Sequence, residues 1–391
     1  MITVFTNANI LDVIGETTIK NGSVLVEDGT IKEVGANIAV PEGAKVVDLG
    51  GKTMLPGIFN CHVHMCSDAG NGRREQISDA SAAIRGIKNL RTLVNSGVTY
   101  IRDAGSPHYI DIDLHEAQLR GDIVAPEMQT AGRCICMTGG HGHDSGREAD
   151  GPDDCRKAAR EQLKAGATWI KVMATGGVMT KGVEPGSPQL TEEELRAAIE
   201  EAHKAGAKSF THAQGMTGIK NALRAGVDSI EHGFFMDDWC FDFMKEHSVF
   251  FVPTLAAPYW IKVNGTAAGI PDYMVRKVEN TIEAHQDTFR RAHKAGVKIA
   301  LGTDAGTPFN KYDLTCYECV LMVENGMTPM EAIQCGTINA AELMSVDATH
   351  GSITPGKRAN FAIFEKDPLE DIHALLNCAM TVIGGEVVFE K

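Results

Sequence analysis

The sequence has little positive charge and no long hydrophobic run. Its 391 residues contain 37 Lys and Arg against 51 Asp and Glu, which gives a formal net charge of −14 at pH 7. Since no basic cluster offsets this balance, a phosphate-binding face is missing and we exclude nucleic acid as a partner. No apolar run has the length that spans a membrane, and the first residues, MITVFTNANI, lack the basic and apolar regions of a signal peptide. We therefore expect a cytoplasmic protein with no membrane partner, and an acidic chain of this kind suits small-molecule chemistry.

The sequence also lacks the cysteine spacing of a disulfide-rich or zinc-ribbon protein. Its ten cysteines are scattered, and several lie beside apolar residues, as buried thiols do. Cys316 and Cys319 form a single CxxC with no second pair at zinc-ribbon spacing, and Cys134 and Cys136 are equally isolated. We expect the cysteines to be reduced and to serve packing.

A repeated joint between helix and strand runs through the middle of the chain. Each copy has a polar or basic helical end, a glycine able to take the left-handed conformation that ends a helix, and then an apolar strand. The copies are NSGVTYI from Asn95, KAGATWI from Lys164, KAGAKSF from Lys204, RAGVDSI from Arg224 and KAGVKIA from Lys294. The helix predicted in TEEELRAAIEEAH has a capping box, with Thr191 followed by Glu194. Helix followed by strand, repeated many times, predicts a parallel sheet.

Eight segments are predicted as the strands of this sheet. They are GIFNCHVHM, VTYIRDAG, EMQTAGRCI, TWIKVMATGG, KSFTHAQ, DSIEHGFF, VFFVPTLA and KIALGTDAG. Eight strands with intervening helices favour an α/β fold in which residues 56–354 form a closed (β/α)8, TIM-like barrel with its chemistry at the C-terminal strand ends. Residues 1–55 and 355–391 instead show short β-like runs and turns, which predicts a small β-sandwich domain built from both termini.

Polar side chains end several of the predicted strands, at the barrel rim. They are His62 and His64 on the first strand, Lys171 on the fourth, His212 on the fifth, His232 on the sixth and Asp304 on the eighth. Each alone has a simple structural explanation, such as a hydrogen-bonded histidine, a lysine that reaches solvent or an aspartate that caps a turn. Together on one rim they predict a metal site, because residues i and i+2 of a strand share a face and can hold one cation. Imidazoles with a carboxylate suit zinc, and manganese, iron and cobalt fit the same geometry.

Lys171 is the unexpected member of this set, since an ammonium group would repel cations. A desolvated lysine deprotonates readily, and a neutral amine can take up carbon dioxide to form a carbamate. The modified side chain would then be a carboxylate able to bridge two metal ions.

These motifs, from LPGIFNCHVHM through GTDAG to ITPGKRANFAIFE and GGEVVFEK, resemble the amidohydrolase superfamily over nearly the whole chain. The chain is most similar to the imidazolonepropionase-related group, which includes Xaa-Pro dipeptidases (prolidase-like enzymes) and zinc-dependent carboxypeptidases acting on dipeptides or N-acyl amino acids. The resemblance implies His62, His64 and Asp304 on one metal ion, His212 and His232 on a second, and a carboxylated Lys171 bridging both.

The expected reaction is hydrolysis of the amide bond of a dipeptide or N-acyl amino acid by a metal-activated hydroxide. Asp304 would act as general base and then as general acid. Hydrolysis of a cyclic amide, lactam or lactone remains an alternative, since its metal centre is similar. A mononuclear deaminase is less favoured, because Ala213 and Gln214 follow His212 where deaminases carry a glutamate nearby. A non-catalytic scaffold is the alternative outside the enzymes, and we also expect a homo-oligomer, since symmetric assembly is common.

Several loop residues are candidates for substrate binding. His141 and His143 lie in the glycine-rich stretch TGGHGHDSG, and the resemblance suggests that His141 bonds the substrate carbonyl or carboxylate; a solvated loop is the alternative. Lys181, in the long and lid-like loop GGVMTKGVEPGSPQ, either attracts an anionic group or is simply exposed. Phe234 and Phe235 predict an apolar pocket wall.

The second predicted strand ends in Arg102 and Asp103, within YIRDAG. We interpret them as a buried pair that supports the rim without taking part in the chemistry.

Overall fold

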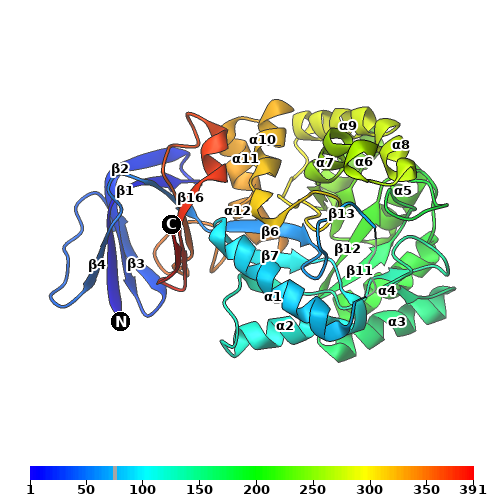
Figure 1. Cartoon of the computed structure of the whole chain (residues 1–391), viewed down its shortest axis with the longest axis horizontal. Coiled ribbons are helices and arrows are strands. Elements are labelled where there is room, and N and C mark those ends of the chain that lie inside the picture. The colour runs from blue at the N-terminus through cyan, green and yellow to red at the C-terminus, as the bar shows by residue number, and fades with distance from the viewer. Residues whose placement is uncertain (74–76) are drawn as a thin grey trace.

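The computed structural model describes residues 1–73 and 77–391. Figure 1 shows an elongated molecule, with a β-rich part that contains both termini at one end and a larger part of strands and surrounding helices at the other. The strands β6 and β7 and their neighbours β11–β13 lie inside the larger part, and helices cover them from outside (Figure 1).

Strands from both ends of the chain form one eight-stranded sheet. Its order is β17-β16-β15-β5-β1-β2-β3, with β4 paired to β1. The strands are β1 Ile2–Asp12, β2 Thr17–Glu27, β3 Thr30–Gly35, β4 Lys45–Asp48, β5 Thr53–Pro56, β15 Phe361–Phe364, β16 Cys378–Ile383 and β17 Glu386–Glu390. Antiparallel pairing of Leu55 with Ala362 joins the N-terminal strands to the C-terminal ones. This sheet agrees with the prediction of a β unit built from both termini, while the domain boundaries stay predictions.

The larger part contains two parallel sheets. A six-stranded sheet has the order β10-β9-β11-β12-β13-β14, and a three-stranded sheet has the order β6-β7-β8. The strands are β6 Ile58–Val63, β7 Val98–Asp103, β8 Glu127–Gln129, β9 Ile135–Cys136, β10 Arg147–Glu148, β11 Trp169–Met173, β12 Lys208–Ala213, β13 Ser229–His232 and β14 Phe250–Val252. The predicted α/β fold with parallel strands is thus confirmed.

The predicted eighth strand, KIALGTDAG, is not a regular strand. Two isolated parallel bridges join it to the sheets, Phe251 with Ile299 on the six-stranded sheet and Val63 with Ala305 on the three-stranded sheet. Asp304 has a φ of 60°, outside the extended range, which interrupts the strand geometry between the two bridges. Among the described residues, regular pairing therefore gives two parallel sheets, and closure into one barrel stays a prediction.

The helices confirm the repeated helix-to-strand joint. They are α1 Asp79–Asn95, α2 Ile110–Leu119, α3 Pro152–Ala165, α4 Glu192–Lys204, α5 Met216–Ala225, α6 Asp238–Glu246, α7 Ala256–Asn264, α8 Asp272–Glu279, α9 Ile282–Ala295, α10 Tyr317–Glu324, α11 Pro329–Cys335 and α12 Ile338–Leu343. Gly166, Gly226 and Gly296 end α3, α5 and α9 in the left-handed conformation. The predicted capping box of α4 is present, with the Thr191 side chain accepting from Glu194 N.

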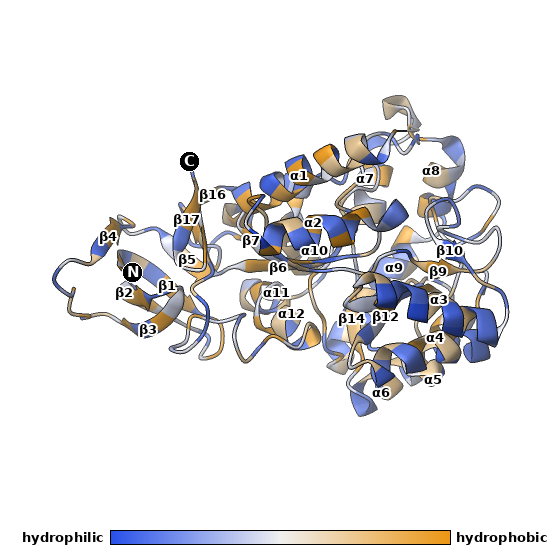
Figure 2. Cartoon of the chain, turned by 90° about the horizontal axis from the view of Figure 1, so that it is seen from below, coloured by the Kyte–Doolittle hydropathy of each residue, from blue (hydrophilic) through white to orange (hydrophobic). Residues whose placement is uncertain are grey.

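Burial follows the expected pattern of apolar strands beneath amphipathic helices. Figure 2 shows β6 in the hydrophobic colour, whereas α3, α4 and α9 carry much hydrophilic surface. All ten cysteines are free, Cys66 half-buried and the others buried, as predicted. None of the described helices combines the length and apolar composition needed to cross a membrane.

Candidate metal centre

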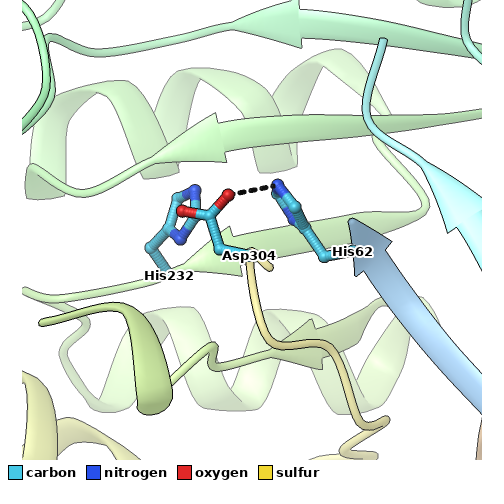
Figure 3. Close-up of side chains that lie close together, drawn as sticks. All are labelled: His62, His232 and Asp304. Atoms are coloured by element: carbon cyan, nitrogen blue, oxygen red, sulfur yellow. Dashed lines mark ion pairs between the residues drawn. The ribbon is translucent and has the colours of Figure 1, made fainter. Parts of the chain in front are cut away.

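Three of the predicted ligands lie close together at the ends of neighbouring segments. The ligand atoms of His62, His232 and Asp304 lie within 4.8 Å of one another. Figure 3 shows the Asp304 carboxylate between the two imidazole rings, with His62 reaching it from the end of β6. Nε2 of His62 is 3.4 Å from Asp304 Oδ1, and Nε2 of His64 is 3.2 Å from the same oxygen.

Local backbone geometry turns two of these side chains toward the centre. His232 ends β13 with a φ of 71°, and Asp304 has a φ of 60°, both in the left-handed region that non-glycine residues seldom adopt. A backbone hydrogen bond of 2.8 Å from Asp304 N to His62 O fixes the aspartate beside β6. Such conformations persist where the surrounding structure compensates their cost, and they are common at functional sites.

A buried ion pair holds the ring of His62. His62 Nδ1 lies 2.7 Å from Glu231 Oε2, and Arg102 Nη2 donates to Glu231 Oε1 at 2.8 Å; Glu231 and Arg102 have no exposed surface. Burial raises the pKa of Glu231, but the bond from Arg102 opposes this and favours the ionised carboxylate. An ionised carboxylate only accepts, so it holds the proton of His62 on Nδ1, and the Nε2 lone pair faces Asp304. A carboxylate in this position also makes the imidazole a stronger ligand.

The interpretation of Arg102 and Asp103 as a pair is therefore wrong, although both are buried. Successive residues of β7 point to opposite faces, so their side chains separate. Arg102 bonds Glu231 and lies over the rings of Phe210 and Trp169, at 4.0 and 4.5 Å from their centroids. Asp103 instead accepts from the backbone N–H groups of the rim, including that of Met65 at 2.7 Å.

Neutral oxygen atoms hold His212 and His232. His212 Nε2 lies 2.9 Å from the Gly176 carbonyl oxygen, which only accepts, so the proton is on Nε2 and the lone pair on Nδ1. His232 Nδ1 lies 2.7 Å from Thr254 Oγ1, whose own hydrogen goes to the Pro253 carbonyl oxygen at 2.7 Å. The hydroxyl therefore accepts from His232, and Nε2 carries the lone pair.

The electrostatics favour neutral forms of His62, His212 and His232 beside an ionised aspartate. Burial holds the pKa values of His62, His212 and His232 well below the ordinary value. Burial alone would raise the pKa of Asp304, but the hydrogen bond from His64 and the neighbouring imidazoles outweigh it and lower that pKa. For His64 the desolvation is likewise outweighed by Asp304, which raises its pKa.

Lys171 on β11 is buried among these groups. Its Nζ lies 4.6 Å from the centroid of the Phe210 ring, and within residues 1–73 and 77–391 no hydrogen bond or ion pair holds it. Burial lowers the pKa of Lys171 to about 8. A substantial share of this amine is therefore neutral near physiological pH.

The predicted ligands open into one cavity of about 690 Å³. It is lined by His62, His64, Lys171, His212, His232 and Asp304, together with His141. The ring of His141 packs 4.2 Å from that of His212, and its Nδ1 lies 2.8 Å from Thr180 Oγ1. Among His141, His143 and Lys181, His141 thus lies beside the candidate ligands.

His143 and Lys181 lie farther out. They line an outer hollow of about 320 Å³, which shares Arg73 and Asp144 with the main cavity. His143 Nε2 lies 3.1 Å from Asp144 Oδ1, and the side chain of Lys181 is exposed. The structure therefore does not bring these two residues to the candidate metal centre.

Phe234 lines a small apolar recess that continues from the main cavity beside His232. The recess, of about 30 Å³, is also walled by Val178, Ala257, Pro258 and Ile261. Phe235 packs against the same hydrophobic cluster and does not line the recess. An apolar wall beside the candidate ligands agrees with the prediction for Phe234.

Two supporting residues were missed by the sequence reasoning. Glu231 had a usable signal, since it is a single acidic residue inside an apolar strand segment and directly precedes a candidate ligand. Thr254 had none, because only the fold brings it to His232, across 22 positions of sequence.

Comparison with known proteins identifies the family. The model of the amidohydrolase family matches residues 53–388. The chain is 30% identical to an ochratoxinase from Aspergillus niger, over 90% of this chain and 79% of that protein. A solved Xaa-Pro dipeptidase with bound methionine in its active site superposes with a TM-score of 0.93 at 31% identity, and a prolidase complexed with N-methylphosphonate-L-proline with 0.93 at 29%. Both alignments cover the whole of each chain. The resemblance read from the motifs is confirmed, and the chain belongs to the amidohydrolase family, a family of hydrolases.

Proposed function

We propose that the protein hydrolyses the amide bond of a dipeptide or an N-acyl amino acid, as an Xaa-Pro dipeptidase or a carboxypeptidase-like enzyme with two metal ions. One observation carries this proposal: the six predicted ligands line a single cavity that continues into an apolar recess. A substrate that joins an apolar side chain to an amide would fill the recess and bring its carbonyl to the ligands. The similarity to a dipeptidase and a prolidase supports the peptide class.

The donor set fits divalent metal ions, of which zinc suits it best. Each of His62, His212 and His232 has one ring nitrogen held by an acceptor and the other left as a lone-pair donor. We assign His62, His64 and Asp304 to one ion and His212 with His232 to the other. Bound metal would supply hydroxide near neutral pH and polarise the substrate carbonyl.

The residues of the chain would handle the proton and the substrate. Asp304, kept ionised by its imidazole neighbours, takes the proton of the attacking water and returns it to the leaving nitrogen. His141 lies on the cavity wall and hydrogen-bonds the substrate carbonyl or carboxylate. Phe234 accommodates the apolar group.

We further propose that Lys171 carries a carbamate. Its buried amine, with a pKa lowered to about 8, is neutral often enough to attack carbon dioxide, forming an N–C bond and losing a proton. The product is a carboxylate on a side chain whose unmodified amine finds no hydrogen bond or ion pair among the described residues. Carbamate formation would appear as a ¹³C resonance after incubation with labelled bicarbonate, and Lys171→Met should abolish it.

The finer architecture belongs to the same proposal. Segment 298–305 bridges both parallel sheets, which supports a closed (β/α)8 barrel over residues 56–354. Residues 1–55 and 355–391 would form the small β domain, and we expect a homo-oligomer in the cytoplasm.

The deciding experiment combines metal content per chain with hydrolysis of a library of Xaa-Pro, Xaa-Arg and N-acyl amino acids. Two metal ions and amide cleavage support the proposal. One metal ion with ammonia release would place the protein among deaminases, and cleavage only of lactams or lactones would move it to cyclic substrates. Stoichiometric metal without turnover of any of these compounds would indicate a non-catalytic scaffold. Treatment with a chelator should abolish activity, and added Zn²⁺ should restore it.

A further inference from the structure

A lysine outside the set of candidate ligands is enclosed by the loop that follows β11. Lys277 on α8 is 1% exposed, and its Nζ donates to the carbonyl oxygens of Gly177 at 2.9 Å, Thr180 at 2.7 Å and Val183 at 2.5 Å. These three bonds match the three hydrogens of the ammonium group, and a longer contact of 3.5 Å reaches the carbonyl oxygen of Val178. Because buried carbonyl groups need partners, Lys277 satisfies three acceptors that the loop itself leaves open.

The same loop touches the site through its other atoms. The carbonyl oxygen of Gly176 accepts from His212, and Thr180 Oγ1 bonds His141 at 2.8 Å. The backbone at Gly177 lies so close to His141 that an added Cβ would stand 2.5 Å from the imidazole. Val178 contributes a wall of the apolar recess. The path of residues 176–183 therefore decides where His141 and the recess wall lie.

Helix α8 is well placed to hold this path. Its apolar residues Met274, Val275 and Val278 are buried in one cluster with Val178 and Phe234. Two further contacts reach the loop from the outer side of the helix, where the Tyr273 hydroxyl donates to Met179 O at 3.0 Å and Arg276 pairs with Glu184 at 3.2 Å. Both members of the ion pair are half-exposed, so it contributes little on its own.

We propose that Lys277 is a positioning residue, which holds residues 176–183 against the cavity and so places His141 and the wall of the apolar recess. The loop wraps around the ammonium group, which donates hydrogen bonds to its carbonyl oxygens. Without it, the carbonyl groups of Gly177, Thr180 and Val183 lose this partner and the loop opens toward solvent, while α8 stays anchored by its apolar face.

Limited proteolysis tests the proposal without any substrate. Lys181 lies within the loop and is exposed, so trypsin reports on opening by cutting after it into fragments 1–181 and 182–391. In Lys277→Met we expect cleavage at Lys181 to be at least about tenfold faster than in the wild type, since local opening controls proteolysis. Arg276→Met, one residue away on the same helix and contacting the same loop, is the matched control and should stay within about twofold. Equal cleavage of the wild type and Lys277→Met would overturn the proposal.

Kinetics supply a second readout, which rests on the proposed amide hydrolysis. With metal content unchanged, Lys277→Met should raise KM for the best library substrate by at least about tenfold, with a smaller change in kcat, because substrate positioning is lost before the chemistry. Unchanged KM together with faster cleavage would reject the link to the site. If the wild type turns over none of the substrates, the proposed function fails while the trypsin result still decides the role of Lys277. Should Lys277→Met not fold, Lys277→Gln, which keeps two donors on a shorter side chain, takes its place with the same expected outcomes.

Discussion

The two sides of the candidate metal centre differ in what holds their histidines. On the side of β6, His62 is bonded to the ionised Glu231, which is itself bonded to Arg102. On the side of β12 and β13, His212 and His232 are bonded to a backbone carbonyl and to a hydroxyl. Both arrangements fix the ring orientation and the position of the proton, but only the first places a full negative charge behind the ring.

The charged side needs additional support because it is costly to bury. Glu231 has no exposed surface, and Arg102 compensates its charge from within a cradle of Trp169 and Phe210. The partners of His212 and His232 are neutral and need no counter-charge, so the Gly176 carbonyl group and the Thr254 hydroxyl group are enough to hold these rings. The comparison indicates that His62 is the more strongly donating ligand and that its supporting network matters more for stability.

The largest effect should come from the residue that faces both sides, Asp304. Asp304→Asn removes the ionised carboxylate, so the site loses both an anionic metal ligand and the group that accepts the proton. We expect turnover of the best amide substrate to fall about 10³-fold, within the usual contribution of general acid–base catalysis. Steady-state kinetics with metal analysis provide the measurement, and a variant that keeps its metal and full activity would exclude Asp304 from proton transfer.

The next effect in size should come from the charged side. Glu231→Gln removes the negative charge behind His62, and we expect metal affinity to fall about 10- to 100-fold, as for other partners of metal-bound histidines. The variant also leaves Arg102 buried without its counter-charge, at a cost of about 3 kcal/mol in the free energy of unfolding. Competition with a coloured chelator measures the first quantity and urea unfolding the second. Wild-type affinity in this variant would remove the charged partner from the explanation.

A smaller effect should follow on the neutral side. Thr254→Val removes the hydroxyl that accepts from His232 while keeping the shape of the side chain. We expect a loss of metal affinity of about tenfold or less, because a neutral hydrogen bond is weaker than a charged one. If the loss equals that of Glu231→Gln in the same chelator assay, the charged partner of His62 contributes no more to metal affinity than the neutral partner of His232.

A separate effect, on stability and not on metal affinity, concerns pH and the segment after Thr254. Glu318 accepts from the backbone N–H groups of Leu255 and Ala256, and burial raises its pKa from an ordinary 4.5 to about 8. Between these two values the folded state holds a proton that the unfolded state has lost. The free energy of unfolding therefore falls as pH rises from 5 to 8, by at most about 1.4 kcal/mol per pH unit from this group. Urea unfolding of Glu318→Gln should show a shallower dependence than the wild type, and parallel curves would contradict the shift.

The sequence predicted the elements whose signals are local. The glycines after the helices, the capping box at Thr191 and the apolar strands all act within a few residues, and the structure confirms them. The segment KIALGTDAG misled the prediction, because its apolar start is typical of a strand while Asp304, with a φ of 60°, turns the backbone at the site. Hydrophobic pattern does not report such a turn.

In the candidate site, the ligands could be predicted from local sequence signals, whereas their supporting partners could not. The ligands stand at strand ends, where spacing and residue type are visible in the sequence. Their supporting partners come from distant segments, as Glu231 lies 169 positions from His62 and Lys277 lies 100 from Gly177. The pairing of Arg102 with Glu231, and not with Asp103, was likewise decided by which strands become neighbours. A single sequence does not show which strands become neighbours.

The sheet shared by the two ends of the chain has a consequence for biosynthesis. Strand β5 is made early, but its partner β15 is about 300 residues later, so a ribosome releases nearly the whole protein before that edge can close. Until then β5 offers unpaired backbone groups to any other strand, including those of neighbouring nascent chains. Closing so long a loop is also slow. The sheet is therefore completed only after β15 has been synthesised. Until then the newly made chain is most exposed to aggregation and to chaperones.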